Sequence, residues 1–227
     1  MSLSRESSHE ERKAASDVVY DSLTDYFFNG VNFINYVYSD FGSTTYGGTT
    51  GTVVTTSYNK SSRIIDTSVG KHLSVGRISR TKCTFYITQL PSLEGYLLSP
   101  ASFNGDSLGT PTSLSILRSY VGLKFINNKI LIVKKEVGGA EVTYESGVDV
   151  TLTNGSTKTH TLEVYHNIRS TDIYIDGVFI RTVESDMVGS DGVTPITFYP
   201  LFSPGRSIDG TLVNIVVENF QFIQQKQ

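Results

Sequence analysis

The chain of 227 residues has no tryptophan and a single cysteine, Cys83. One thiol excludes an intrachain disulfide and any structural zinc site built on several cysteines. Cys83 lies in the strand-like stretch TKCTFYIT, where we expect a small buried side chain. No apolar run approaches the length of a membrane span, and the N-terminal stretch MSLSRESSHEERKAASD lacks the apolar core of a secretory signal. We therefore expect no membrane insertion, no signal peptide and synthesis in the cytoplasm.

Charge is also scarce, with 19 Lys and Arg against 22 Asp and Glu and a net charge of -3. A balance this close to zero predicts no nucleic-acid partner. Charge is unevenly spread, because six cations lie between Lys60 and Lys82, where Asp66 is the one acid. A solvated sheet face is the better interpretation of that stretch, and a binding patch for anionic glycans or phosphate is the alternative.

Catalytic motifs are absent as well. Glycosidases built on β-sandwiches carry paired carboxylates spaced ExDxxE, and the chain has no such motif, no G-x-S-x-G elbow and no HExxH. His160 and His166 share one face of a predicted strand but lie too far apart for one metal ion, so we interpret both as structural or surface histidines. We therefore expect no enzyme, no catalytic residues and no metal ligands, with a glycan-processing hydrolase as the alternative.

Calcium is the one cofactor that the sequence leaves open. Asp186, Asp191 and Asn154 carry oxygen ligands in predicted loops, but no dense D-x-D-x-D-G loop is present. We expect no cofactor, and calcium binding by these loops is the alternative.

The chain is rich in Ser and Thr and has 20 Gly. β-Branched Thr suits a pleated surface, and Gly supplies turns, so this composition favours strands. Many short alternating stretches, separated by Gly, Asn, Asp and Pro, follow one another beyond about residue 70 without a fixed repeat. The pattern predicts an all-β, two-sheet antiparallel sandwich.

Only the N-terminal stretch has a helical period. Ser8 and Glu11 form a capping box, and apolar residues then recur every three or four positions to about Phe28. We predict an arm and amphipathic helix over residues 1–30 and a β-sandwich domain over residues 31–227. An apolar helix face needs a cover, so we expect it to dock or oligomerise. The docking residues are Val18, Val19, Leu23, Phe27 and Phe28.

Two hairpins can be predicted residue by residue. In VGLKFINNKILIV, a turn at Asn127 and Asn128 places four apolar side chains on one core face. These four are Leu123, Phe125, Ile130 and Ile132.

The second hairpin is STDIYIDGVFIRT, with a type I′ turn at Asp176 and Gly177. This register pairs Ile173 with Ile180 and Ile175 with Val178 on an aliphatic core face. It pairs Tyr174 with Phe179 and Asp172 with Arg181 on the other face. Aromatic rings beside fixed polar groups suit carbohydrate recognition, so Asp172, Tyr174, Phe179 and Arg181 are the predicted glycan-binding residues. The alternative is that these rings fill the core between the sheets or shield a sheet edge.

The stretches THTLEVYHNIRSTDIYIDGVFIRTV and FSPGRSIDGTLVNIVVENFQF resemble the later strands of concanavalin A-like and laminin G-like lectin domains. The resemblance covers about residues 159 to 222. It implies a jelly-roll sandwich of two curved antiparallel sheets, which serves glycan binding, adhesion or structural display. The fold alone does not choose among these functions.

A Ser-, Thr- and Gly-rich β protein led by a short helical arm also resembles bacteriophage or viral virion components, such as tail, fibre or capsid-decoration proteins. That resemblance implies a virion location and synthesis in the host cytoplasm. It also implies a non-enzymatic structural or adhesion role. The expected partners are other virion proteins, further copies of the chain, such as a trimer, and a host-surface glycan. A capsid or tail scaffold without any ligand is the alternative.

Overall fold

The computed structural model describes the following residues: 28–29, 37–39, 44–47, 52–56, 61–64, 79–89, 94–103, 117–126, 129–150, 152–153, 156–167, 169–184, 198–199, 201–206 and 214–224. Every regular element in this part of the chain is a strand, which confirms the all-β prediction. The predicted N-terminal helix lies outside the described residues, except for Phe28. That residue lies in strand β1 (Phe28–Asn29), opposite Phe222.

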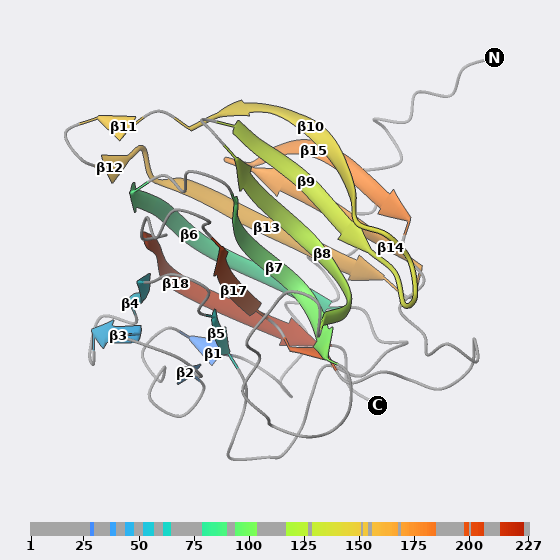
Figure 1. Cartoon of the computed structure of the whole chain (residues 1–227), viewed down its shortest axis with the longest axis horizontal. Coiled ribbons are helices and arrows are strands. Elements are labelled where there is room, and N and C mark those ends of the chain that lie inside the picture. Colours follow the sequence, from blue (N-terminus) through green and yellow to red (C-terminus); the bar gives the residue numbers. More distant parts are fainter. Residues whose placement is uncertain are drawn as a thin grey trace.

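The described strands form two eight-stranded antiparallel sheets and one two-stranded sheet (Figure 1). Sheet A has the order β15-β14-β13-β6-β18-β4-β3, and β1 pairs with β18. Its strands are β15 (Val178–Glu184), β14 (Ser170–Ile175), β13 (His160–Asn167), β6 (Ser79–Gln89), β18 (Asn214–Gln224), β4 (Thr52–Thr56) and β3 (Thr44–Gly47).

Sheet B has the order β10-β9-β8-β7-β17-β5-β2, and β16 pairs with β7. Its strands are β10 (Val142–Asp149), β9 (Lys129–Lys135), β8 (Leu117–Ile126), β7 (Glu94–Phe103), β17 (Leu201–Arg206), β5 (Ser61–Ile64), β2 (Val37–Ser39) and β16 (Phe198–Tyr199). A small hairpin of β11 (Leu152–Thr153) and β12 (Ser156–Thr157) lies between β10 and β13 in the chain.

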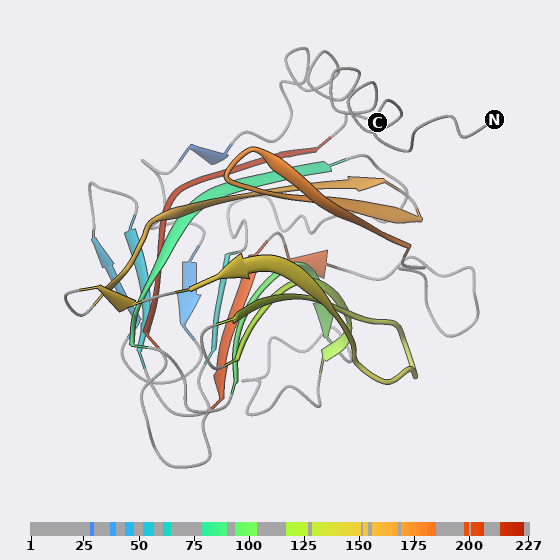
Figure 2. The same cartoon turned by 90° about the horizontal axis from the view of Figure 1, so that it is seen from above.

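The two sheets face each other and are both curved (Figure 2). Sheet B is arched, and the open side of its arch is directed away from sheet A. The outward face of sheet B is therefore concave, and its inward face packs against sheet A. This arrangement leaves each sheet one inward face for the core and one outward face for other contacts.

The core lies between the sheets and follows the period-two alternation of the strands. It contains Cys83, Phe85 and Ile87 of β6 with the inward residues of the facing strands. The predicted β8–β9 hairpin is confirmed: Phe125 lies opposite Ile130, and the four predicted apolar side chains are all buried. Burial raises the pKa of the Cys83 thiol to about 12, so it stays protonated and unreactive.

The second predicted hairpin is correct at its turn and wrong farther along. Tyr174 lies opposite Phe179 as predicted, but the register then shifts, so that Ile173 lies opposite Arg181 and Asp172 opposite Thr182. The predicted Ile173–Ile180 and Asp172–Arg181 pairs do not form. A β-bulge at residue 180 accounts for the shift, because two residues of β15 there oppose one of β14.

The hairpin also differs from the prediction in which side chains reach the core. Ile180 still packs against the core, and Arg181 lies over the ring of Tyr144 in sheet B, with its guanidinium carbon 4.0 Å from the ring centroid. Val178, predicted to be in the core, is 62% exposed. The aliphatic core face of this hairpin thus consists of Ile173, Ile175 and Ile180.

The Asp-Gly pair makes a structural turn. Asp176 and Gly177 have φ angles of 54° and 76°, as a type I′ turn requires. One carboxylate oxygen of Asp176 accepts a hydrogen bond from the Thr161 N–H at 2.9 Å, and the other lies 2.9 Å from His160 Nδ1. Burial alone would raise the pKa of Asp176, but these bonds outweigh it and lower that pKa. The side chain therefore fastens the turn to β13.

One end of the core is polar. Ser99 of sheet B donates to Thr81 of sheet A at 2.7 Å, a buried hydrogen bond between the sheets. His166 is 2% exposed, and its Nδ1 lies 2.8 Å from Thr171 Oγ1. Its Nε2 is buried without a hydrogen-bond partner in the described part of the chain. Burial lowers the pKa of His166 to about 4, so the ring is neutral at pH 7.

We predict that this histidine makes stability depend on pH between 6.5 and 4. His166 has its ordinary pKa of 6.5 in the unfolded chain and a pKa of about 4 in the folded protein, so between these pH values only the unfolded chain binds the proton. The free energy of unfolding is therefore highest above pH 6.5 and falls as the pH decreases. The expected loss between about pH 7 and about pH 5 is about 2 kcal/mol. Urea unfolding of the protein and of His166→Gln at both pH values checks this. An equal loss in the two proteins would refute the assignment.

We also predict that Gly122 is required for the close pairing of β7 and β8. A Cβ at this position would lie 2.4 Å from the carbonyl oxygen of Leu97 and 2.7 Å from Cα of Leu98, both backbone atoms. Gly122→Ala should therefore cost about 3 kcal/mol in the free energy of unfolding. The control is Gly139→Ala, whose Cβ would have its nearest neighbour at 3.4 Å. Similar urea midpoints for the two variants would contradict the prediction.

Candidate functional site

The outward face of sheet A carries a row of aromatic rings. The ring centroids of Tyr165 and Tyr174 are 5.4 Å apart, and those of Tyr174 and Phe179 are also 5.4 Å apart, both in edge-on geometry. The guanidinium carbon of Arg80 lies 5.4 Å from the Tyr165 centroid. These contacts join β6, β13, β14 and β15 across one face and stabilise the sheet.

A buried carboxylate neutralises two cations of this face. Glu163 lies 3.1 Å from Arg80, 3.2 Å from Lys82 and 3.0 Å from the Tyr165 hydroxyl, which donates to it. Burial alone would raise the pKa of Glu163, but its hydrogen bonds to Lys82, Tyr165 and Arg80 outweigh burial and lower that pKa. Arg80 and Lys82, the two cations of the Lys60–Lys82 stretch whose side chains are described, are thus both ion-paired.

The four predicted glycan-binding residues do not lie together. Asp172, Tyr174 and Phe179 share the outward face of sheet A, whereas Arg181 reaches Tyr144 at the edge of the sandwich. Asp172 accepts a hydrogen bond from Thr182 at 2.6 Å and is 7% exposed, and Tyr174 is 4% exposed. Glycan binding by these residues stays a prediction, but so little exposed ring surface is poorly suited to stacking on a sugar.

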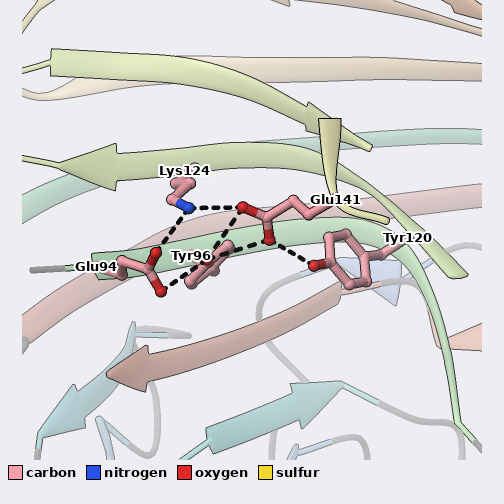
Figure 3. Close-up of polar contacts among 5 residues, drawn as sticks. All are labelled: Glu94, Tyr96, Tyr120, Lys124 and Glu141. Atoms are coloured by element: carbon pink, nitrogen blue, oxygen red, sulfur yellow. Dashed lines mark hydrogen bonds and ion pairs between the residues drawn. The ribbon is translucent and has the colours of Figure 1, made fainter. Parts of the chain in front are cut away.

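The concave face of sheet B carries a second group, which we call the Lys124 cluster (Figure 3). It consists of Glu94 and Tyr96 on β7, Tyr120 and Lys124 on β8, and Glu141, which directly precedes β10. The alternate residues of β7 and β8, such as Leu97 and Leu123, belong to the core, so the cluster faces outward.

Lys124 lies at the centre of the cluster. Its Nζ lies 2.8 Å from Glu94 Oε1 and 2.6 Å from Glu141 Oε1. The Tyr120 hydroxyl donates to Glu141 Oε2 at 2.6 Å. The Tyr96 hydroxyl lies 3.0 Å from Glu94 Oε2 and 3.2 Å from Glu141 Oε2. Two carboxylates that are 47 positions apart in the sequence are thereby held in one fixed arrangement.

The members of the cluster differ in exposure. The residues Tyr96 and Tyr120 are 1% and 2% exposed, whereas the side chains of Glu94 and Glu141 are 22% and 25% exposed and that of Lys124 is 10% exposed. The carboxylates are therefore the parts of the cluster that a ligand in the arch meets first.

Burial and the nearby carboxylates fix the charge states of the cluster. Burial raises the pKa of Tyr96 and of Tyr120 far above the ordinary value, and Glu141 and Glu94 add to the rise. Burial alone would lower the pKa of Lys124, but its bonds to Glu141 and Glu94 outweigh burial and raise that pKa. At neutral pH the tyrosines are neutral donors and the lysine is charged, which gives a preorganised set of hydrogen-bonding groups.

The cluster was not predicted from the sequence. The stretch VGLKFI was interpreted only for its core face, although Lys124 alternates with that face and Tyr120 directly precedes the stretch. Glu94 and Tyr96 show a similar alternation in LEGYLL. A signal was therefore available in β7 and β8, but Glu141 follows a Gly-Gly turn and has no local pattern.

No metal site is found among the described residues, where no three His, Cys, Asp or Glu side chains gather. The calcium ligands considered from the sequence, Asp186, Asp191 and Asn154, lie outside these residues. The described part of the chain also contains no helix long and apolar enough to cross a membrane.

No protein-family model matches the chain, and no curated protein matches it. Several solved structures do match the chain. The carbohydrate recognition domain of Emp47p superposes with a TM-score of 0.57 at 11% identity, over 91% of this chain and 98% of that chain. The family 7 alginate lyase A1-II′, solved in complex with substrate, has a TM-score of 0.52 at 14% identity, over 90% and 83%.

The binding domain of botulinum neurotoxin serotype D has a TM-score of 0.51 at 12% identity. This match covers 84% of the chain and 43% of the toxin chain, so the protein spans less than half of that structure. The chain is a jelly-roll sandwich. The fold expected from the lectin resemblance is confirmed, whereas the virion location stays a prediction.

We predict that removing the central cation of the jelly roll's concave face destabilises the protein in a pH-dependent way. Lys124→Met leaves two adjacent carboxylates without a counter-charge, at an expected cost of about 3 kcal/mol at pH 7. Like charges raise carboxylate pKa values, so acid should protonate one of them and reduce the loss. Thermal unfolding between about pH 7 and about pH 4.5 checks this.

The control is Lys129→Met. Lys129 pairs with Glu145 at 3.4 Å, and their side chains are 57% and 71% exposed, so its loss should change stability by less than about 0.5 kcal/mol. A loss for Lys124→Met that is equal at both pH values would contradict the prediction.

Proposed function

We propose that the protein is a non-enzymatic glycan-binding protein whose Lys124 cluster contacts the glycan on the concave face of sheet B. The observation that carries the proposal is the pair of partly exposed carboxylates, Glu94 and Glu141, fixed by Lys124 in the arch of a jelly roll. Jelly-roll structures similar to this chain include a carbohydrate recognition domain and a lyase solved with its substrate.

Sugar recognition requires oriented polar groups. A free carboxylate on a long side chain loses rotamer entropy when it binds, and this loss weakens the complex. Lys124, Tyr96 and Tyr120 hold both carboxylates in place before a ligand arrives. The cluster can therefore accept hydrogen bonds from sugar hydroxyls with little further ordering.

The charge states of the cluster favour binding over acid–base chemistry. A general base works best when its pKa lies near the working pH. The pKa values of Tyr96, Tyr120 and Lys124 are all raised from values that already exceed 9. None of these three groups is a ready proton acceptor at neutral pH.

The proposal includes a location and partners. The Ser-, Thr- and Gly-rich composition supports a structural or adhesion protein of a virion, which displays the sandwich towards a host-surface glycan. The predicted helix with Val18, Val19, Leu23 and Phe27 would join it to other virion proteins or to further copies of the chain. A pure capsid or tail scaffold would share these features but would bind no glycan.

A specific observation also favours a second function, that of a glycan-processing enzyme. Two carboxylates on either side of a cation lie on the concave face, and the fold is shared with an alginate lyase. Incubation with polysaccharides, followed by assays for new reducing ends and for unsaturated uronate ends, tests it. We expect no product, and catalytic release of either kind of end would establish the second function instead.

We predict that a glycan array reveals saturable binding that depends on the cluster. Glu141→Gln should lower the affinity for the best-binding glycan about tenfold, because a hydrogen bond to a charged acceptor becomes one to a neutral acceptor. Glu145→Gln on the same sheet, whose side chain is 71% exposed, is the matched control and should bind like the unchanged protein. The absence of saturable binding would favour the scaffold.

The variant Tyr174→Ala tests whether the glycan binds the outward face of sheet A or that of sheet B. In this account it lowers the melting temperature and changes glycan affinity less than about twofold, because the ring packs between Tyr165 and Phe179. A large loss of affinity with an unchanged melting temperature would place the glycan on sheet A instead.

A further inference from the structure

We infer that the Lys124 cluster selects neutral, hydroxyl-rich glycans and rejects carboxylated or sulfated ones. This inference rests on the proposed function, and it specifies the chemical class of ligand that the site takes. It is argued from two properties of the cluster: the direction of its donors and the exposure of its carboxylates.

The donors of the cluster are directed inward. The Lys124 ammonium contacts both Glu94 and Glu141, and the Tyr120 hydroxyl donates to Glu141. The single proton of the Tyr96 hydroxyl is directed to the same two carboxylates. A site for an acidic sugar needs cationic donors aimed at the ligand, as in bidentate carboxylate or phosphate recognition. Here an acidic ligand would have to displace carboxylates that are already bound.

The charge of the cluster itself is negative, because two carboxylates and one ammonium sum to a single negative charge. In the registers of the neighbouring strands Lys135 lies opposite Tyr120 and Arg206 lies opposite Glu94. The selection therefore rests on the groups that face the ligand and not on the net charge of the sheet.

Exposure strengthens this selection. The side chains of Glu94 and Glu141 are 22% and 25% exposed, whereas that of Lys124 is 10% exposed. A carboxylated or sulfated sugar entering the arch meets two negative groups before the positive one. Repulsion between like charges at contact distance opposes its binding.

A neutral sugar can donate hydrogen bonds to the two partly exposed carboxylates, because its hydroxyls are donors. The rings of Tyr96 and Tyr120 are buried, so hydrogen bonds to carboxylates rather than stacking carry the affinity. Such binding involves no net ion pairing with the ligand and should depend little on salt.

The experiment uses the full chain on an array that carries neutral glycans together with their uronate, sialylated and sulfated counterparts. We expect saturable binding among the neutral members only. Saturable binding confined to acidic members would overturn the inference while leaving the proposed function in place. No saturable binding to any member would overturn the proposed function itself.

Isothermal titration with the best neutral hit and its acidic counterpart supplies the second readout. Raising NaCl from about 0.05 M to about 0.5 M should change the neutral affinity less than about twofold. Glu94→Gln replaces a charged acceptor with a neutral one, so it should lower the affinity for the neutral glycan about tenfold. It also removes one negative charge, so it should reduce the ratio of neutral to acidic affinity. Glu145→Gln should alter neither value. A steep loss of neutral affinity with salt, or an unchanged preference in Glu94→Gln, would count against the inference.

Circular dichroism and thermal unfolding of each variant show whether it is folded. If Glu94→Gln does not fold, Glu141→Gln carries the same test, because both carboxylates contact Lys124. The two substitutions remove the same kind of charge from β7 and from the start of β10, so they should shift the preference in the same direction.

Discussion

The ammonium group of Lys124 between two carboxylates is the interaction on which the proposed site depends. It joins Glu94 of β7 to Glu141 beside β10, across the intervening strands β8 and β9. An ion pair that is largely removed from water is costly to leave incomplete, so each partner fixes the others. The close pairing of β7 and β8 at Gly122 sets the spacing of the strands that carry it.

The jelly roll gives the two outward faces different roles. On sheet A, aromatic rings and the ion pairs of Glu163 cover part of the surface, and Glu163, Tyr165 and Tyr174 are buried there. On sheet B, the arch leaves two carboxylates partly exposed on its concave side. The same sandwich thus combines a face that stabilises the fold with a face that can meet a ligand.

Local patterns in the sequence predicted part of this structure. The β8–β9 register and the Asp176–Gly177 turn followed from alternation and turn chemistry, and both are confirmed. The bulge at residue 180 leaves no such trace, because the alternation of STDIYIDGVFIRT is unbroken in the sequence. The Lys124 cluster was missed for a different reason: its members come from three stretches that only the sheet order brings together.

The most direct test of the account is to locate the glycan on the protein. NMR titration of the isotopically labelled full chain with the best neutral glycan from the array would map the contacted backbone amides. The account predicts shifts concentrated at β7, β8 and the β9–β10 turn, around Tyr96, Lys124 and Glu141. Shifts concentrated instead on β13–β15, around Tyr165 and Tyr174, would contradict it.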